Sequence, residues 1–147
     1  KPSKVRFFEG EDVVANIYKD IVLSLSLLED SQREVQLILS GEDLLETEPE
    51  AADWFAKKRM EEGISINWIA PESKIVREKY VVDAQQYKRK IKFFDGKKYP
   101  FHISILIYAN CIALISLKGQ RSGVIIENEL FASSFQSMFN FFWDSLK

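Results

Sequence analysis

Apolar residues in the first forty positions follow two different spacings, which predict a strand, a helix and a second strand. Residues 5–8 and 34–40 are short β-favouring runs bounded by polar segments. Between them, apolar side chains recur every three or four positions, the spacing that places them on one face of a helix. These positions are Val13, Val14, Ile17, Ile21, Leu25 and Leu28.

A second helical region is predicted directly after the strand at residues 34–40. Ser40, with Asp43 three residues later, resembles an N-terminal cap, and Pro49 must interrupt or restart the helix because a helix interior does not accommodate its ring. Gly63 is well placed to end the region in a left-handed conformation, and residues 64–70 form another β-favouring run. The order strand, helix, strand predicts a parallel pair joined by a right-handed crossover.

The second half of the chain shows a different pattern. Residues 72–86 are polar and predict part helix and part loop, after which extended runs are joined by short turns. Asp95-Gly96 and Ala109-Asn110 mark tight turns, since Gly and Asn tolerate a positive φ. We therefore expect an antiparallel meander in this half. Its runs are YKRKIKFFD, FHISILIY, CIALISL and SGVIIEN.

Residues 129–146, close to the end of the chain, predict a helix with Asn128 as its cap. Phe141 and Trp143 lie off its main apolar stripe, so the helix is hydrophobic on more than one face. Such a helix suits a two-fold dimer interface at Phe141 and Trp143, or simple deep burial inside the monomer. The main stripe consists of Phe131, Phe135, Met138, Phe139, Phe142 and Leu146.

Composition and charge narrow the function classes. With 147 residues, 46% of them hydrophobic, the chain can bury a core as one domain over residues 1–147. Its net charge of −2 makes direct DNA binding by this domain unexpected. The lone Cys111 indicates a reducing compartment, the cytoplasm, and no Cys/His cluster points to zinc. Residues 101–117 are apolar but contain His102 and Asn110, so we interpret them as two strands and not as a membrane span.

Several local strings resemble a known family. The ending RSGVIIENELFASSFQSMFNFFWDSLK is similar to the close of the TrmB-like transcriptional regulators, where a strand reading G-V-I-I-E-[ND] leads into a helix ending in two aromatic residues and Trp. ILIYANCIALISL and KKRMEEGISINWIAP resemble that family's hairpin and its helix into a central strand. The likeness extends from about Val5 to Lys147, although family members usually carry a Gly-Asp type turn in place of Ala109-Asn110.

This resemblance implies a phospholipase-D-like α/β fold with a mixed sheet, in which a parallel βαβ unit is followed by an antiparallel meander and a C-terminal helix. It implies a non-catalytic effector-binding domain that senses a ligand, with sugars as effectors in some members, and that forms a homodimer. DNA would be bound through a winged helix-turn-helix preceding this fragment. The chain begins at Lys1 and not at Met, which indicates either a domain excised from a longer protein or a processed N-terminus.

The sequence does not contain a complete phospholipase D motif. Phospholipase D chemistry needs a His, a Lys two residues later to hold phosphate, and an Asp five residues beyond that. The only histidine is His102, followed at those positions by Ser104 and Ala109. Neither a GxSxG elbow nor a nucleotide-binding glycine motif is present, and Cys111 fits a small buried strand residue. We therefore expect no catalysis, cofactor or metal, and keep a phosphodiester hydrolase with a degenerate site as the weakest alternative.

The basic run at residues 88–92 raises a nucleic-acid hypothesis, because alternation would place Lys88, Lys90 and Lys92 on one sheet face. A charged edge strand that discourages aggregation is the interpretation we prefer.

Ligands of parallel sheets favour the carboxyl ends of the strands. The candidate ligand-binding residues are therefore those after the two predicted parallel strands, together with His102, which the resemblance places at the lost catalytic site. The alternative is ordinary turn chemistry. The candidates are Ser40, Gly41, Glu42, Pro71, Glu72, Ser73 and His102.

The leading hypothesis from the sequence is thus a regulatory sensing and dimerisation domain of a transcriptional regulator. A stand-alone protein-interaction module without a small-molecule ligand is the second hypothesis.

Overall fold

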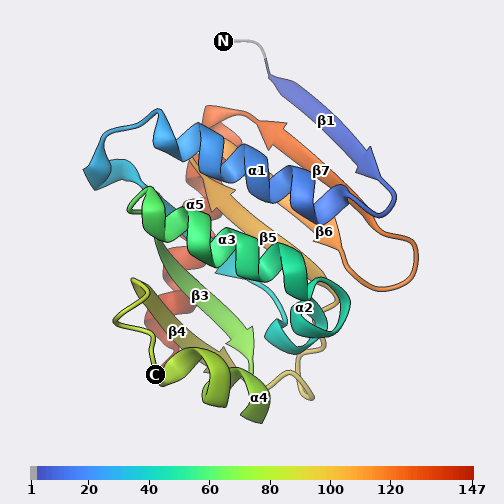
Figure 1. Ribbon diagram of the computed structural model, residues 1–147, viewed down its shortest axis with the longest axis vertical. Coiled ribbons are helices and arrows are strands. Elements are labelled where there is room, and N and C mark those ends of the chain that lie inside the picture. Colours follow the sequence, from blue (N-terminus) through green and yellow to red (C-terminus); the bar gives the residue numbers. More distant parts are fainter. Residues whose placement is uncertain (1–2) are drawn as a thin grey trace.

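The computed structural model describes residues 3–147 as one seven-stranded mixed sheet with helices on both faces (Figure 1). The strand order is β1-β7-β6-β5-β2-β3-β4. The strands are β1 (Lys4–Glu9), β2 (Glu34–Ile38), β3 (Ser65–Pro71), β4 (Arg89–Phe94), β5 (Ile103–Tyr108), β6 (Cys111–Ser116) and β7 (Ser122–Glu127). The helices are α1 (Val13–Ser26), α2 (Gly41–Thr47), α3 (Pro49–Glu61), α4 (Lys74–Val76) and α5 (Glu129–Ser145), with a 3-10 turn at Asp30–Gln32 and a π-helical turn at Arg77–Val81.

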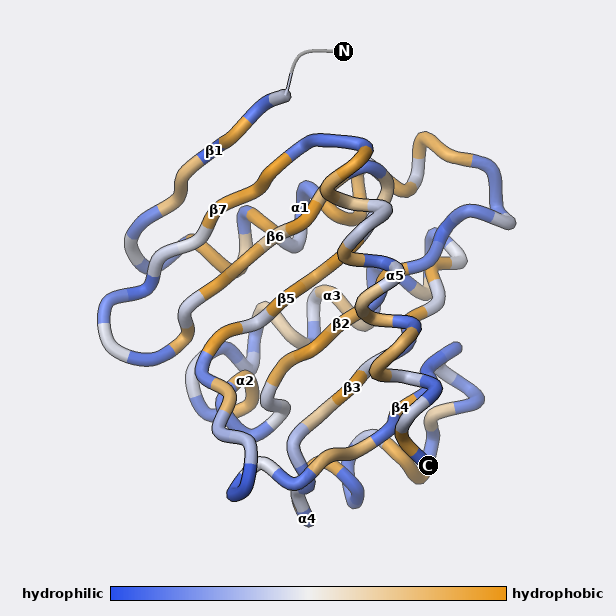
Figure 2. The backbone as a smooth tube through the Cα atoms, turned by 180° about the vertical axis from the view of Figure 1, so that it is seen from behind, coloured by the Kyte–Doolittle hydropathy of each residue, from blue (hydrophilic) through white to orange (hydrophobic). Residues whose placement is uncertain are grey.

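The helices α1 to α4 lie on one face of the sheet, and α5 lies on the other (Figures 1 and 2). The larger core forms under α1 and α3. Of the predicted apolar face of α1, Leu28 lies beyond the end of the helix and is partly buried, and the other five residues, Val13, Val14, Ile17, Ile21 and Leu25, are buried. A smaller cluster under α5 is built from Ile38, Ile69, Ile107 and Phe139. The central strand β2 buries side chains on both faces, with Leu37 in the larger core and Ile38 in the smaller cluster, although Gln36 between its apolar residues is polar.

The parallel unit predicted from the sequence is confirmed. The strand β2 pairs in parallel with β3, and α2 and α3 form the connection. Ser40 accepts a hydrogen bond from Asp43 N at 3.2 Å, so it caps α2 as expected. Pro49 restarts the helix at the first position of α3, where its missing N–H costs nothing, and Gly63 follows with φ +66°.

The strand β4 corrects the prediction of a meander that begins at residue 87. It pairs in parallel with β3 at the edge of the sheet, so β2 and β3 separate it from β5. Asp95 does form a local turn by accepting from Lys97 N and Lys98 N, but this turn opens the long connection of residues 95–102 and not a hairpin. A turn signal specifies a local change of direction, whereas the partner of an extended run is chosen by long-range packing.

The rest of the meander is confirmed. The strands β5, β6, β7 and β1 pair antiparallel in that order. Tyr108 and Cys111 face each other across the predicted two-residue turn, where Ala109 has φ 49°. Residues 72–86 contain the short α4, the π-helical turn and further turns, as predicted. Cys111 is buried, in agreement with its interpretation as a small core residue.

The terminal helix α5 has the predicted cap, because Asn128 Oδ1 accepts from Phe131 N at 2.9 Å. Its buried side is rotated from the predicted stripe, since three stripe residues, Phe131, Met138 and Phe142, are about half exposed. The other three stripe residues face the sheet, since Phe139 is buried and Phe135 and Leu146 pack against the cluster under α5. Ala132 and Trp143, which lie outside the predicted stripe, are also on this side: Ala132 is buried, and Trp143 packs against the cluster. Apolar residues occupy several sides of this helix, so their spacing does not decide which side faces the sheet.

The lysines of β4 support the edge-strand interpretation. Lys90 is exposed on the outermost strand, and Lys88 precedes the strand with φ 52°. Lys92 Nζ donates to the carbonyls of Trp143 (2.9 Å) and Leu146 (3.1 Å), at the C-terminal end of α5. A cation there satisfies unpaired carbonyls and complements the helix dipole, so Lys92 joins β4 to α5.

Candidate functional site: a cleft at the carboxyl edge of the parallel strands

The carboxyl ends of β2, β3 and β4 border a cleft of about 850 Å³. The segments that follow these strands, including the starts of α2 and α4, form two of its sides, and Figure 1 shows both helices at this edge of the sheet. Residues 95–102 run from β4 to β5 along the same edge, and Lys118, after β6, completes the lining. Because β2, β3 and β4 run parallel, the chain leaves all three strands at the same edge of the sheet. The segments that follow them surround the hollow.

Six of the seven candidate residues lie in the lining of this cleft: Ser40, Glu42, Pro71, Glu72, Ser73 and His102. Gly41 does not line it. A Cβ atom on Gly41 would lie 2.4 Å from Val76 Cγ2 and 2.9 Å from Trp68 Cη2, so this residue permits close packing of α2 against α4 and β3. The sequence interpretation missed the contribution of β4, because that strand was assigned to the meander. The lining residues missed were Asp43, Lys74, Phe93, Phe94, Asp95, Gly96, Lys97, Pro100, Phe101 and Lys118.

Ser73 joins two sides of the cleft. Its Oγ donates to Glu42 Oε1 at 2.9 Å and accepts from Val76 N at 3.2 Å, where it caps α4. Ser73 is buried, so the contact between α2 and α4 is fixed below the surface while the Glu42 side remains exposed. One oxygen of Glu42 thus stays oriented toward the cleft wall by a buried hydroxyl.

Glu72 is held by Arg77 in a bidentate ion pair, with both N···O distances at 2.6 Å. The hydrogen bonds from Arg77 lower the pKa of Glu72, which favours its ionised form. The Arg77 guanidinium in turn lies 4.1 Å from the centroid of the Phe93 ring. Glu72 is therefore a fixed hydrogen-bond acceptor at the cleft, with its charge already balanced.

Charges in the cleft nearly cancel. Asp43 pairs with Lys118 at 3.4 Å. The lining carries four carboxylates, Glu42, Asp43, Glu72 and Asp95, and three ammonium groups, Lys74, Lys97 and Lys118. A site for a phosphodiester or nucleic acid concentrates positive charge, and this lining does not.

His102 lies exposed at the start of β5, on the rim of the cleft. Ser104, two residues later, is buried within the strand, and Ala109 lies in the hairpin turn at the far end of β5. The positions that would carry the phosphate-binding Lys and the orienting Asp of a phospholipase D motif hold neither group. Apolar surface is supplied by Phe93, Phe94 and Phe101.

The described residues, 3–147, show neither a metal-ligand cluster nor a membrane-spanning helix. They contain no group of three or more His, Cys, Asp or Glu side chains arranged to hold a metal ion. None of their helices combines the length and apolar character needed to cross a membrane.

Comparison with known proteins gives a fold but no family. No protein-family model matches the chain, and no curated protein matches it. Among solved structures, NucT from Helicobacter pylori matches with a TM-score of 0.66 at 13% identity, covering 99% of this chain and 98% of its own. Nuc from Salmonella typhimurium, a phospholipase D family member, matches with a TM-score of 0.63 at 12% identity, covering 99% and 97%.

The chain has a phospholipase-D-like fold. The archaeal chromatin protein TrmBL2, whose structure shows a novel mode of DNA binding, shares it with a TM-score of 0.66 at 16% identity. That match covers 98% of this chain but 54% of TrmBL2, so the phospholipase-D-like domain described here spans about half of the chromatin protein.

Proposed function

We propose that this phospholipase-D-like domain is a non-catalytic, effector-binding domain of a TrmB-like transcriptional regulator, in which the cleft binds a small polar molecule. The observation that carries the proposal is the cleft itself: it is roomy and lined by fixed polar groups, yet its charges nearly cancel and its one histidine lacks the partners for phosphoryl chemistry. The fold shared with TrmBL2 supports a place in a DNA-associated protein. DNA would be contacted by another part of that protein, since this domain has no net positive charge.

The cleft chemistry suits a ligand rich in hydroxyl groups, such as a sugar. Its volume is within the range of about 300–1,000 Å³ that is typical of small-molecule sites. Glu42 and Glu72 can accept hydrogen bonds from hydroxyls, and Lys118 can donate to them. Phe93, Phe94 and Phe101 provide apolar surface for the C–H face of a ring. A neutral polyol satisfies such a lining, whereas a phosphate group would find no net positive charge there.

A thermal-shift screen against sugars, sugar phosphates and phosphodiesters tests the proposal, because a ligand that binds the native state raises Tm by mass action. We expect a saturable shift with a neutral sugar or polyol. In Glu42→Gln the affinity should fall about tenfold or more, because a charged acceptor is lost. Glu46→Gln is the matched control: Glu46 is on the same helix but outside this cleft, and its affinity should be unchanged. The absence of any shift across the panel would contradict effector binding.

Catalysis is tested separately with a chromogenic phosphodiester. We expect hydrolysis by the wild-type domain to equal that of His102→Ala. Turnover that disappears in His102→Ala would overturn the non-catalytic assignment and favour the hydrolase.

Dimerisation is the second half of the proposed function, and the outer side of α5 is the surface that favours it. Leu130, Phe131, Met138, Phe141 and Phe142 are exposed there, with Phe141 at 70%. Trp143, the other interface candidate, stacks on Phe139 with ring centroids 5.7 Å apart and lies 4.8 Å from Lys92 Nζ, so it contributes to the monomer core under α5. An exposed apolar stripe of this size marks an interaction surface.

Sedimentation of Phe141→Glu tests this surface. We expect a homodimer in the wild type and a monomer in Phe141→Glu. Leu27→Glu is the control, because Leu27 is equally exposed but follows α1 on the opposite layer. A wild-type monomer would remove dimerisation from the proposal, and a stable monomer that still binds no ligand would leave the protein-interaction module as the better hypothesis.

A further inference from the structure

One half of a sheet face carries apolar side chains that no helix of residues 3–147 covers. On the side of α5, the strands β1 and β7 and the outer part of β6 lie beyond that helix (Figure 2). The register aligns Phe7 with Val124, Val124 with Leu114, and Leu114 with Ile105, so these side chains point to one face. Ile105 packs against the cluster under α5, which identifies this face as the one that carries α5. We call the outward positions beyond α5 the open half of the sheet: Val5, Phe7, Glu9, Leu114, Ser116, Ser122, Val124 and Ile126.

The open half is more apolar than a sheet face that contacts water. A sheet with one face in water alternates apolar inward residues with polar outward ones. Five of the eight outward residues of the open half are apolar, and Glu9 alone is charged. Phe7 is 80% exposed, and together with Leu114, Val124 and Ile103 it lines a groove of about 310 Å³. An exposed apolar area of this kind marks an interaction surface.

The helix α5 has two apolar sides that the monomer leaves uncovered. Its outer side carries Leu130 and Phe141, which are both mostly exposed. One flank carries Phe131, Met138 and Phe142, each of them about half exposed. The opposite flank is polar, and its residues are Ser133, Gln136, Asn140 and Asp144.

The apolar flank of α5 faces the open half of the sheet. Trp143 lies 4.8 Å from Lys92 Nζ, so its side of the helix is directed toward β4, at the opposite edge of the sheet from β1. With about 3.6 residues per turn, the flank of Phe131, Met138 and Phe142 lies on the other side of the helix from Trp143. This flank is therefore directed toward β7 and β1.

A second copy of this chain supplies what both surfaces lack. The open half lacks an apolar helix to cover it, and the outer side of α5 lacks an apolar partner. Within one copy the two surfaces lie side by side on one face of the sheet, so they cannot contact each other. A two-fold axis that runs parallel to this face, between α5 and the open half, forms both contacts at once. The open half carries a single charge, Glu9, so its chemistry favours an apolar partner over a charged one.

We propose that α5 of a second copy covers the open half of the sheet, and that each copy contributes this contact to a two-fold dimer. The two α5 helices then lie side by side in one layer between the two sheets. The outer side of each helix packs on the partner's open half, the apolar flanks pack against each other, and the polar flanks remain in water. The inference rests on the proposed dimerisation and names the surface that the partner's α5 contacts.

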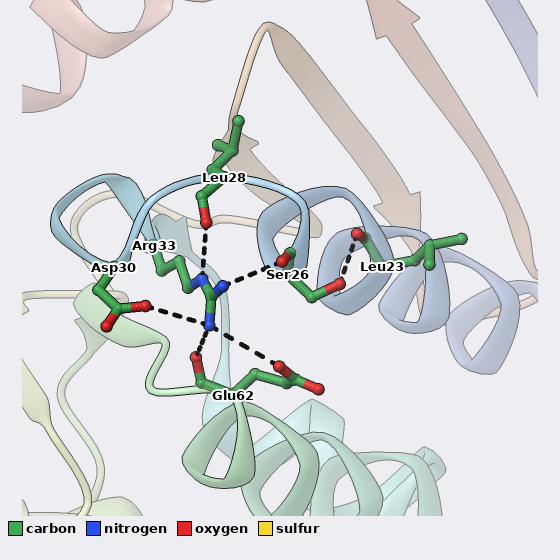
Figure 3. A network of polar contacts seen from close by, with 6 residues as sticks. All are labelled: Leu23, Ser26, Leu28, Asp30, Arg33 and Glu62. Atoms are coloured by element: carbon green, nitrogen blue, oxygen red, sulfur yellow. Dashed lines mark hydrogen bonds and ion pairs between the residues drawn. The ribbon is translucent and has the colours of Figure 1, made fainter.

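Sedimentation of Phe7→Glu tests the contact, because Phe7 belongs to the open half and not to α5. We expect a wild-type dimer and a dissociation constant that rises at least about 100-fold in Phe7→Glu, since the dimer would bury two unpaired carboxylates. Val5→Glu, on the same strand and the same face, should act alike. Leu23→Glu is the matched control and should dimerise as the wild type does. Leu23 is 63% exposed on α1, in the opposite layer, and Figure 3 shows its side chain directed away from the Arg33 network.

The outcomes separate this inference from the proposed dimerisation. Dimers that persist in Phe7→Glu and Val5→Glu would overturn the inference. If Phe141→Glu alone then dissociates, dimerisation stands, but through a different contact of α5. A wild-type monomer would overturn both.

Photo-cross-linking identifies the surface that Phe141 contacts. Benzoylphenylalanine replaces Phe141 in an unlabelled copy, which is mixed with a wild-type copy labelled with heavy isotopes, and tandem mass spectrometry locates the residues joined between copies. We expect position 141 to be joined to residues 4–9 of β1 or 122–127 of β7 in the labelled copy. The same probe in place of Leu23 should join no copies. Cross-links from position 141 that reach only α5 of the labelled copy, or none between copies, would contradict the inference.

Discussion

Gly41 offers the sharpest test of how the cleft is built, because its substitution should act through packing alone. In Gly41→Ala the added methyl would lie 2.4 Å from Val76 Cγ2 and 2.9 Å from Trp68 Cη2, whereas carbon atoms prefer about 3.5–4.0 Å. Neither neighbour can move freely. Val76 is fully buried, and Trp68 is fixed by a hydrogen bond from its Nε1 to Leu39 O at 3.0 Å.

The magnitude follows from opposing effects. Overpacking in a well-packed core costs about 1–3 kcal/mol. Ala has a better helix propensity than Gly and restricts the unfolded chain, which returns up to about 1 kcal/mol at the first position of α2. We therefore expect Gly41→Ala to lower the free energy of unfolding by about 1–2 kcal/mol, and Tm by about 2–4 °C for each kcal/mol.

Urea unfolding followed by circular dichroism measures this loss, with Glu46→Ala as the control on the exposed side of the same helix, expected within about 0.5 kcal/mol of wild type. A double-mutant cycle then tests the cause. Val76→Ala removes the nearest atom, so the double variant should be more stable than the sum of the two single effects by about 1 kcal/mol. A Gly41→Ala domain as stable as the wild type, or strictly additive effects in the cycle, would refute the packing argument.

Three further predictions concern single groups. Ser40→Ala should destabilise the domain by about 1 kcal/mol in urea unfolding, because Asp43 N loses its cap; no loss would show that water replaces the hydroxyl. Burial raises the pKa of Cys111 from 9.0 to about 11, so at pH 8 its reaction with a thiol reagent should be at least about 100-fold slower in the native than in the unfolded protein, and equal rates would contradict this. Burial, with Asp20 nearby, raises the pKa of Tyr108; its stabilising effect is present below the unfolded value of 10.0 and is lost as pH rises above it. The alkaline fall in stability should therefore be less steep in Tyr108→Phe and unchanged in the exposed Tyr99→Phe.

Local chemistry explains which parts of the fold could be predicted from the sequence. The caps at Ser40 and Asn128, the restart at Pro49 and the turn after Tyr108 are each specified by residues within four positions of one another. The parallel pair β2 and β3 followed from the order of its elements, and six of the seven candidate residues line one cleft, while ligand binding by them stays a prediction.

Long-range packing explains what could not be predicted. The residues RKIKFF do not specify whether β4 pairs with β3 or with β5. The contribution of β4 to the cleft was therefore not predicted. The rotation of α5 about its own axis could not be predicted either. Phe139, which is buried, and Phe142, which is exposed, both belong to the same apolar stripe. Arg59 lies among charged residues in AKKRMEEG, so the sequence suggests a solvent-exposed helix residue. In the structure its guanidinium is buried and donates to the carbonyl of Tyr87, 28 positions away.

The contacts that hold the cleft open do not require a ligand. Ser73 donates a hydrogen bond to Glu42, and Glu72 forms an ion pair with Arg77. Beneath them, the apolar side chains of Val76 and Trp68 pack against Gly41. A cleft maintained in this way keeps its shape when the groups at its rim change, because the residues that set its geometry differ from those that would act on a substrate. Such a scaffold can therefore lose phosphoryl-transfer groups around His102 and still offer a preformed pocket. A preformed pocket avoids the cost of ordering its walls on binding, which is the property an effector domain needs to respond to a small molecule with few contacts.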